Sequence, residues 1–367
     1  MQKIIYALCL VFSLLIPFQT VCAFEGGNIS AECYALMDAE TGEILCQRGG
    51  DTRVYPASLT KIVTAIVALQ SAEPGKRITV TSEAAGTEGS SVYLAVGEVL
   101  TLEQLLYAVL LESANDAAAA VAIGLCGSIE GFAGKMNEYV LSLGLKDTHF
   151  VNPHGLTDKE HYSTAKDMAR ILCHAMENEQ FRAITSSFRY RLEGNEYCMA
   201  RQFTNHNRLL QSLEGVVGGK TGYTRASGRC LATYCVRGGK ALCAVTMNAP
   251  DDWHDHELLY AYGFTLYTVV ALDTGNLPPL YVCGGNAPFV TAVDPEHTEL
   301  TLKLGGGDIL RRVYMRRFEF APVNKGELIG YAVYFYGGNE IYRIPLYASK
   351  AVEIKKREGF WTGSWKR

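Results

Sequence analysis

The sequence has no excess of basic residues. Its 367 residues include 34 lysines and arginines against 38 aspartates and glutamates, for a formal net charge of −4. It also lacks an arginine-rich segment and any alternation of aromatic and basic residues, so nucleic acid is not an expected partner. Nearly half of the residues are hydrophobic, which is enough for a sizeable core, and the length favours two domains.

Long apolar runs are absent beyond the N-terminus. Residues 4–18 form an apolar run that follows Lys3 and precedes small residues at 21–23, a pattern typical of a secretory signal peptide over residues 1–23. An uncleaved anchor and a lipidated Cys22 are the alternatives for this segment. No later run is long enough for a spanning helix. We therefore expect an exported protein, extracytoplasmic in the cell envelope or secreted, whose mature chain starts at Phe24.

Cys-x-x-Cys motifs are missing too, and no cysteine or histidine spacing is typical of a zinc site. Eleven cysteines become nine when Cys9 and Cys22 leave with the signal peptide, and an odd number cannot all pair within one chain. The apolar surroundings of Cys173, Cys235 and Cys243 predict small buried side chains rather than a disulfide framework. We expect no metal and no organic cofactor.

The eight histidines leave one metal alternative open, a zinc peptidase. His254-Asp255-His256 is their tightest cluster, and we interpret it as a solvated helix start. His154 and His161 are expected to serve hydrogen bonds in loops.

Hydrophobic periodicity divides the chain, which has no internal repeat. A hairpin is expected over residues 33–45, and a strand pair over 228–247 with its turn at Gly238-Gly239. Helices are expected from Ser58 onward and over 102–123, 129–144, 163–176 and 256–268, with a loop at 78–97. If the first and last strands share one antiparallel sheet with the helices against it, the fold class is α/β (α+β).

The sequence pattern changes after Leu272, from helices and longer strands to short β-like runs. Residues 273–279 resemble a linker, and short β-like runs follow at 281–283, 300–304, 313–320, 328–336 and 340–346. These runs predict a small all-β module, a sandwich. The expected domains are 24–272 and 277–353, followed by a basic and aromatic tail at 354–367.

Ser58 and Lys61 form a Ser-x-x-Lys motif where the first helix is expected to begin. Residues three apart share a helix face, and the helix N-terminus favours developing negative charge. A serine becomes nucleophilic beside a base, a role that a neutral lysine can fill. The motif also occurs by chance about once in a chain of this length.

Two further motifs follow along the chain. Ser113 and Asn115 flank Ala114 in an apolar helical stretch, where polar groups need partners. Lys220-Thr221-Gly222 follows the glycine-rich residues 215–219, which would let a substrate backbone approach a strand closely. Taken singly, the Ser-x-Asn motif is explained by a helix contact or cap, and the Lys-Thr-Gly motif by a turn.

In this order, the three motifs are the signature set of penicillin-binding proteins and related β-lactamases. The sequence resembles the low-molecular-weight penicillin-binding proteins, the serine D-alanyl-D-alanine carboxypeptidases that trim peptidoglycan. The resemblance extends to residues 35–42, 55–58, 152–156, 161–165 and 220–224, and to residues 321–323 and 325–326 near the end. It implies a transpeptidase-like domain with an antiparallel sheet and helical block, followed by a small β-domain.

The resemblance also implies a substrate and inhibitors. The substrates would be peptidoglycan stem pentapeptides ending in D-Ala-D-Ala, and β-lactams would acylate the enzyme covalently.

The resemblance further implies roles for individual residues. Ser58 is the expected nucleophile and Lys61 its general base, with a pKa lowered by burial and by Lys220. Ser113 and Lys220 would relay a proton to the departing D-alanine, and Asn115 would hold the substrate amide. The remaining substrate contacts are Thr221 to the terminal carboxylate, Gly222, and the backbone N–H of Tyr223, which with that of Ser58 forms an oxyanion hole.

Two features depart from the family. A basic residue is missing around 253–256, so Arg208 and Arg225 are the candidates for binding the terminal carboxylate. The tail is short, but Phe360, Trp361 and Trp365 lie among basic residues and could contact an anionic membrane peripherally.

Two other functions share the motifs. A class A β-lactamase would need a Glu-x-x-Leu-Asn pattern, which residues 152–161 lack. A non-catalytic wall-binding protein of the same fold would have no need of all the motif residues.

Overall fold

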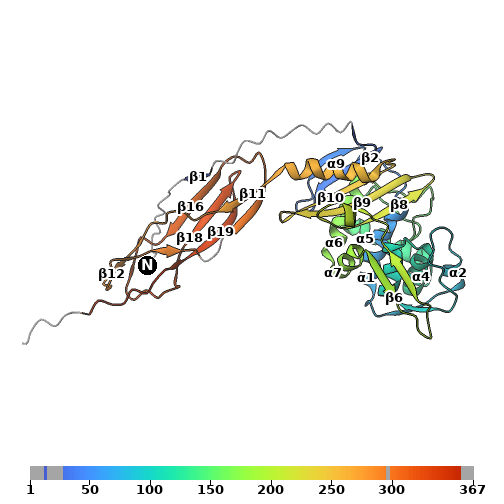
Figure 1. Ribbon diagram of the computed structural model, residues 1–367, viewed down its shortest axis with the longest axis horizontal. Helices are drawn as coiled ribbons and strands as arrows, with labels where there is room; N and C mark the ends of the chain where they lie inside the picture. Colours follow the sequence, from blue (N-terminus) through green and yellow to red (C-terminus); the bar gives the residue numbers. More distant parts are fainter. Residues whose placement is uncertain (1–11, 15–27, 295–297, 357–367) are drawn as a thin grey trace, which may run out of the picture. The chain divides into compact units, whose positions relative to one another are not determined.

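The computed structural model describes residues 12–14, 28–294 and 298–356 (Figure 1). These residues gather into two compact units, one reaching Thr265 and the other running from Leu266 onward. The predicted signal peptide lies outside the described residues, except for the short strand β1 (Phe12–Leu14), which pairs with a strand of the second unit.

The first unit is built on a five-stranded antiparallel sheet. Its strands, in order across the sheet, are β3 (Ile44–Arg48), β2 (Cys33–Asp38), β10 (Lys240–Met247), β9 (Gly228–Arg237) and β8 (Val216–Thr224). Both expected hairpins, β2–β3 and β9–β10, are present. The predicted pairing of early and late strands is confirmed, because Cys33 of β2 lies opposite Met247 of β10. β8 ends this sheet, so one of its edges has no neighbouring strand among the described residues.

Helices cover both faces of the sheet. On one face, the Thr233 hydroxyl lies 2.7 Å from Nδ1 of His256 and 2.8 Å from the Tyr260 hydroxyl, both in α9 (Asp252–Thr265). On the other, the Cys243 thiol donates to the carbonyl oxygen of Ala169 in α6 (Ala165–Glu177). Thr233 pairs with Ala244, the neighbour of Cys243, and adjacent strand residues point to opposite faces.

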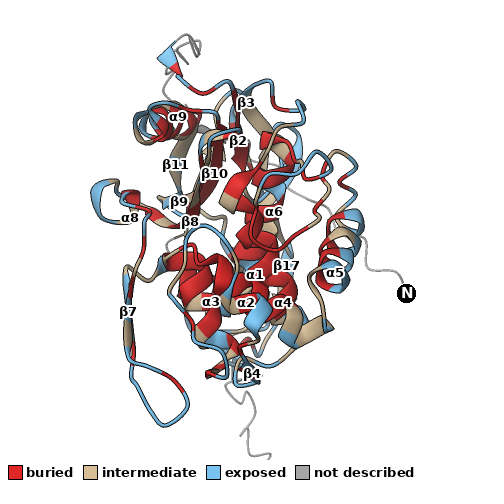
Figure 2. Ribbon diagram, turned by 90° about the vertical axis from the view of Figure 1, so that its right-hand side faces the viewer, coloured by how far each residue is buried: buried red, intermediate tan, exposed pale blue. Residues whose placement is uncertain are grey.

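The helical block beside the sheet forms the largest buried region. Its helices are α1 (Thr60–Ser71), α3 (Leu102–Leu111), α4 (Asn115–Cys126), α5 (Ile129–Ser142) and α7 (Glu179–Ser186). Figure 2 shows α1, α3 and α4 as mostly buried. Shorter elements around them are β4 (Arg77–Thr79), α2 (Ser82–Ala85), β5 (Val99–Thr101), β6 (Arg189–Leu192), β7 (Arg201–Thr204) and α8 (Leu209–Ser212).

Several sequence expectations need correction. The helix expected over 102–123 is two helices, because Ser113 adopts φ of +60° and breaks the chain between α3 and α4. The region expected as a loop contains α2. The helix expected over 256–268 begins at Asp252 and ends at Thr265, because Tyr267 starts strand β11 (Tyr267–Leu272).

The described part of the second unit is all-β, as predicted. One sheet has the order β1, β16 (Ile309–Met315), β18 (Leu328–Tyr336), β19 (Asn339–Ala348), β14 (Ala292–Val293). A second has the order β13 (Phe289–Val290), β12 (Leu280–Cys283), β17 (Phe318–Phe320), and β11 pairs with β15 (Thr298–Lys303). Two small cores stabilise it, one around Tyr334 and one around Leu280.

The cysteines of the described residues are all free thiols. Five are buried, three are partly buried, and Cys283 is exposed. Among the described helices, none has by itself the length and apolar character needed to cross a membrane; α4 and α5 meet that test together but bend by 86° where they join.

Candidate active site

Ser58 and Lys61 meet at the start of α1. Ser58 lies in a 3-10 turn, η2 (Ala57–Leu59), that leads directly into the helix. The three-residue spacing brings Nζ of Lys61 within 2.9 Å of Oγ of Ser58. Ala57 adopts φ of +48°, a left-handed conformation that is costly for a residue with a Cβ atom. The residues around the turn must therefore hold Ser58 in this geometry.

Two glycines approach this turn closely. A Cβ atom at Gly155, which has φ of +86°, would collide with the carbonyl oxygen of Ala57. A Cβ atom at Gly222 would lie 3.1 Å from the backbone nitrogen of Ser58. Because Gly222 belongs to β8, the Lys-Thr-Gly motif lies directly against the serine turn.

The Lys61 amine has three oxygen neighbours. Besides Ser58 Oγ, Nζ lies 2.7 Å from Oδ1 of Asn115 and 2.6 Å from the carbonyl oxygen of His154. Both of these oxygens can only accept hydrogen bonds. A neutral amine therefore gives its two N–H groups to them and turns its lone pair toward the Ser58 hydroxyl.

Burial favours this neutral form. The side chain of Lys61 is fully buried, and burial lowers its pKa well below the usual value of a lysine. The positive charge of Lys220 lowers the pKa further, while Asp116 opposes both effects. The lowered pKa that the sequence led us to expect has the expected causes.

Ser113 and Asn115 lie at the break between α3 and α4. Asn115 starts α4, and its Nδ2 donates to the carbonyl oxygen of Glu88 at 2.6 Å while its Oδ1 accepts from Lys61. Its backbone N–H donates to the carbonyl oxygen of Ser90. The Ser113 hydroxyl forms no hydrogen bond to another described residue. The break thus fixes Asn115 on Lys61 and leaves the Ser113 hydroxyl without a partner inside the described protein.

Lys220 is the second buried amine of the site. It lies in β8 and is 1% exposed, and burial lowers its pKa to about 7, with the Glu112 carboxylate acting in the opposite direction. Its Nζ donates to the carbonyl oxygen of Thr221 at 2.9 Å. The expected hydrogen bond to Ser113 is not formed within the described part of the chain.

The two candidate arginines occupy different places. Arg225 is exposed in the turn between β8 and β9. Arg208, also exposed, lies with its guanidinium 4.8 Å from the ring centre of Trp253. A second guanidinium, that of Arg229, also lies over the Trp253 ring, 5.6 Å from its centre. The sequence had not suggested this residue. Arg229 lies opposite Tyr223 in the β8–β9 pairing, so the two side chains share a face of the sheet.

Arg229 also forms an ion pair. It donates to the buried carboxylate of Asp252 at 2.6 Å. Its position across from the Lys-Thr-Gly strand was the only signal that could have indicated it, and this required knowledge of the strand register.

The histidines are part of the framework. The carbonyl oxygen of His154 contacts Lys61, and burial lowers the pKa of the His154 ring to about 3. His161 lies 2.8 Å from the Thr60 hydroxyl, and burial lowers its pKa to about 4. Each ring also accepts from a loop backbone N–H, that of Leu156 for His154 and that of Val151 for His161, so the prediction that both serve loop hydrogen bonds is confirmed. Both rings are neutral at pH 7.

The cluster 254–256 was predicted wrongly as a solvated helix start. His256 is fully buried on the sheet, and Asp255 accepts hydrogen bonds from Ser30 and Ala31; only His254 is exposed. In the described ranges, no group of three or more histidine, cysteine, aspartate or glutamate side chains is arranged to hold a metal ion.

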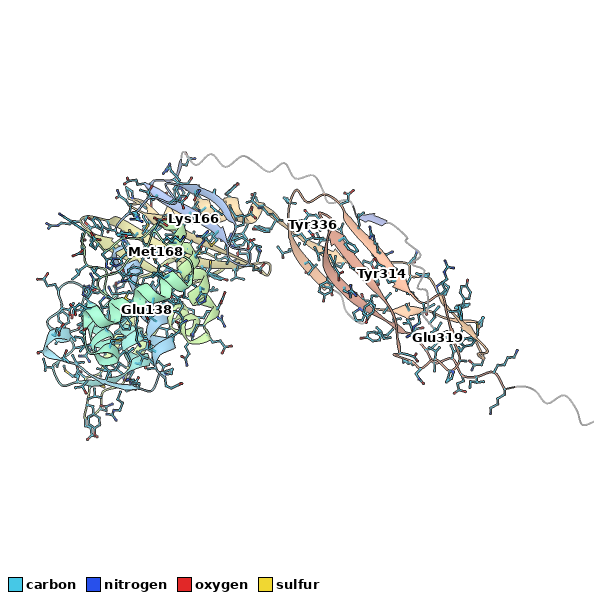
Figure 3. All side chains as sticks on the ribbon, turned by 180° about the vertical axis from the view of Figure 1, so that it is seen from behind. Glu138, Lys166, Met168, Tyr314, Glu319 and Tyr336 are labelled. Atoms are coloured by element: carbon cyan, nitrogen blue, oxygen red, sulfur yellow. The ribbon has the colours of Figure 1, made fainter. Side chains whose placement is uncertain are left out.

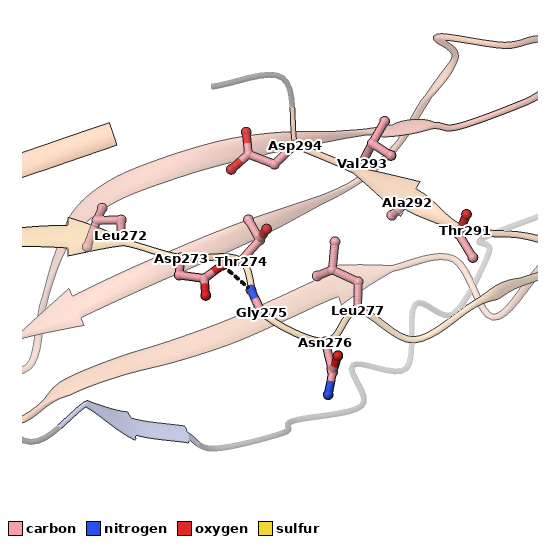
Figure 4. A pocket seen from close by; sticks show the side chains of 10 residues that line it. All are labelled: Leu272, Asp273, Thr274, Gly275, Asn276, Leu277, Thr291, Ala292, Val293 and Asp294. Atoms are coloured by element: carbon pink, nitrogen blue, oxygen red, sulfur yellow. Dashed lines mark hydrogen bonds between the residues drawn. The ribbon is translucent and has the colours of Figure 1, made fainter. Parts of the chain in front are cut away.

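A cavity of about 440 Å³ lies in the second unit (Figure 4). It is lined by residues 272–277 and 291–294, and its loop is held by the Asp273 carboxylate, which accepts from the backbone N–H of Gly275 at 2.7 Å. None of the three motifs lies in this lining.

Comparisons with known families identify both parts of the chain. Residues 20–251 match the family model described as D-alanyl-D-alanine carboxypeptidase. Residues 281–354 match the C-terminal domain of penicillin-binding protein 5. The two matched segments together span most of the chain.

Curated relatives and solved structures agree with this match. The D-alanyl-D-alanine carboxypeptidase DacF of Bacillus subtilis is 30% identical over 353 residues, covering 90% of each chain. DacC of Escherichia coli is 30% identical over 374 residues, covering 93% of this chain and 92% of its own.

Among solved structures, penicillin-binding protein 5 of Haemophilus influenzae has a TM-score of 0.63 at 29% identity, covering 89% of this chain and 98% of its own. A DD-transpeptidase of Streptomyces has a TM-score of 0.62 at 31% identity, covering 65% and 99%. The chain therefore belongs to the D-alanyl-D-alanine carboxypeptidase family of serine peptidases, the low-molecular-weight penicillin-binding proteins.

Proposed function

We propose that the protein removes the terminal D-alanine from peptidoglycan stem pentapeptides through an acyl-enzyme on Ser58. One observation carries the proposal. The buried Lys61 amine has two carbonyl oxygens as neighbours and a third contact, at 2.9 Å, to the serine hydroxyl. This arrangement is what a neutral lysine needs to act as a general base on that hydroxyl.

The reaction is an acyl transfer in two steps. Oγ of Ser58 attacks the carbonyl carbon between the two D-alanines while Lys61 accepts the hydroxyl proton. The backbone N–H groups of Ser58 and Tyr223 stabilise the oxyanion. Ser113 and Lys220 relay a proton to the departing amine of D-alanine. Water then attacks the ester and restores the Ser58 hydroxyl.

The edge of β8 is the proposed site for the substrate backbone. An extended peptide can add to an unpaired strand edge through main-chain hydrogen bonds. Gly222 lets β8 pass directly against the serine turn, so a peptide added to this strand would run past Ser58. Asn115 would hold the substrate amide by exchanging its present partner, the Glu88 carbonyl, for it.

We also propose that the enzyme works outside the cytoplasmic membrane, on the cell wall. The N-terminal pattern of residues 1–23 supports export, and a β-lactam ring would acylate Ser58 by the same route as the substrate. The tail from 357 onward, which lies outside the described residues, is a proposed peripheral membrane contact.

The terminal carboxylate needs a cation. We propose Arg208 and Arg229, which share the Trp253 ring, with Arg225 as the alternative. Replacing the binding arginine by alanine should raise KM about tenfold or more for a peptide ending in a free carboxylate, because a charge-assisted hydrogen bond is lost. The same peptide with a terminal amide should be unaffected.

Steady-state kinetics of the three single variants measure this difference. An increase in KM confined to Arg225→Ala would move the carboxylate site to the tip of the β8–β9 hairpin.

The overall function is tested by two substrates compared side by side. We expect the mature protein to release D-alanine from a pentapeptide ending in D-Ala-D-Ala, and not from one ending in L-Ala. Penicillin should give a slowly decaying adduct, and mass spectrometry of its peptides should locate it on Ser58. Rapid penicillin turnover without D-alanine release would indicate a β-lactamase, and neither reaction a non-catalytic wall-binding protein.

A further inference from the structure

Four aromatic side chains lie together on one face of the three-stranded sheet β13–β12–β17. Tyr281 of β12 pairs with Phe289 of β13 and with Phe318 of β17. Cys283, two residues along β12, pairs with Phe320. Paired residues share a face, as do residues two apart in a strand, so all four rings and Cys283 lie on the same side. We call this surface the aromatic face.

The aromatic face is exposed within its own unit. The exposed fractions are 58% for Tyr281, 42% for Phe289, 53% for Phe318 and 67% for Phe320. The alternate residues of β12, Leu280 and Val282, are buried in the core on the other side of the sheet. The rings of Phe318 and Phe320 contact each other edge to face, with centroids 5.7 Å apart.

This arrangement is unusual for a solvent face. Strands with one wet face normally alternate apolar residues inside with polar residues outside. β12 carries apolar side chains on both faces, and β17 carries two phenylalanines on its outer face. The charged residue of β17 is Glu319, labelled in Figure 3. Contiguous exposed apolar surface of this kind indicates an interaction site.

Basic residues flank the aromatic face at both ends. Arg316 and Arg317 are exposed and directly precede β17. Lys355 and Lys356 are exposed at the other end, where the backbone N–H of Lys355 donates to the carbonyl oxygen of Gly284, next to Cys283. Arg316 forms an ion pair with Glu319 of β17, so part of its charge is already compensated within the protein.

The described chain also ends here. Its last described residues, Lys355 and Lys356, lie beside the end of β12. The eleven residues after them in the sequence include Phe360, Trp361, Trp365, Lys366 and Arg367. Aromatic rings favour the interfacial region of a bilayer, and basic side chains favour anionic lipid headgroups. The aromatic face has both kinds of residue, and the sequence after Lys356 has the same composition.

We propose that the aromatic face docks on the surface of an anionic lipid bilayer. The rings enter the interfacial region, and the flanking arginines and lysines contact lipid phosphates. The proposal does not depend on the enzymatic function, because all of its residues belong to the second unit.

Sedimentation with lipid vesicles tests the proposal on the mature chain, which we expect to start at Phe24. The protein should bind vesicles containing phosphatidylglycerol and bind phosphatidylcholine vesicles much less. The double variant Phe318→Asp with Phe320→Asp should reduce binding to the anionic vesicles by about tenfold or more, since two rings are replaced by anions. Removing residues 357–367 should leave binding that the double variant lowers further.

The matched control is Val269→Asp, which adds a carboxylate at an exposed position of β11, 52% exposed, in the same unit. It should bind like the unchanged protein, and thermal unfolding should show that both variants remain folded. Equal binding by the double variant would overturn the proposal. So would self-association that the double variant abolishes while no form binds vesicles, because the occupant would then be a second copy of the chain.

Discussion

Ser58→Ala is expected to abolish both D-alanine release and the penicillin adduct. The rate should fall by at least about ten-thousandfold, because Ser58 carries the hydroxyl that Lys61 contacts, and alanine leaves this base without a nucleophile. Release of D-alanine from a D-Ala-D-Ala peptide measures the first effect, and intact-mass spectrometry after penicillin measures the second.

A matched serine supplies the control. Ser186→Ala removes an exposed hydroxyl at the end of α7 whose only described bond is to the Ala183 carbonyl oxygen. This variant should retain full activity and the full adduct. A penicillin adduct that survives in the Ser58 variant would refute the assignment of the nucleophile.

Lys61→Met is expected to lower the acylation rate by about a thousandfold or more while the chain stays folded. Methionine keeps much of the buried stem but removes the base. It also leaves Oδ1 of Asn115 and the His154 carbonyl without their donor, so the free energy of unfolding should fall by about 1 to 3 kcal/mol. Stopped-flow acylation by a β-lactam and thermal unfolding measure the two effects.

The pH profile of the unchanged protein separates a base from a merely structural lysine. A lysine with a lowered pKa is neutral above that pKa, so acylation should speed up as the pH rises through the value for Lys61. Lys220, with a pKa of about 7, loses its proton above that pH, and the rate should decline there if Lys220 supplies the proton. An acylation rate that Lys61→Met leaves unchanged at every pH would contradict the role of Lys61.

The fold was predictable where periodicity and turn residues agree. The Gly238-Gly239 turn and the alternating residues on either side predicted β9 and β10, and the 33–45 pattern predicted β2 and β3. The break at Ser113 was missed because its flanks are equally apolar, and one residue with positive φ leaves no trace in hydrophobic periodicity. The burial of His256 was missed because the sequence does not distinguish an exposed histidine from a buried one whose ring is hydrogen-bonded. Its partner, Thr233, is known only from the fold.

Some residues of the candidate site could be named from the sequence, and others only from the fold. Ser58, Lys61, Asn115 and the Lys-Thr-Gly strand could be named from the sequence because the three motifs, in that order, resemble the signature set of a known family. The His154 carbonyl could not, because any residue has a carbonyl oxygen and only the folded loop brings this one to Lys61. Arg229 depends on strand register, which no local pattern specifies.

The buried thiols have a consequence for a chain that is expected to enter oxidising surroundings. Oxidation begins from the thiolate, and burial raises the pKa of Cys46 to about 12 and of Cys230 and Cys235 to about 11. Once folded, these three thiols stay protonated at neutral pH and react slowly with oxidants. These thiols are more vulnerable before folding, and Cys283, which is exposed in the folded protein, stays open to sulfenic acid formation afterwards.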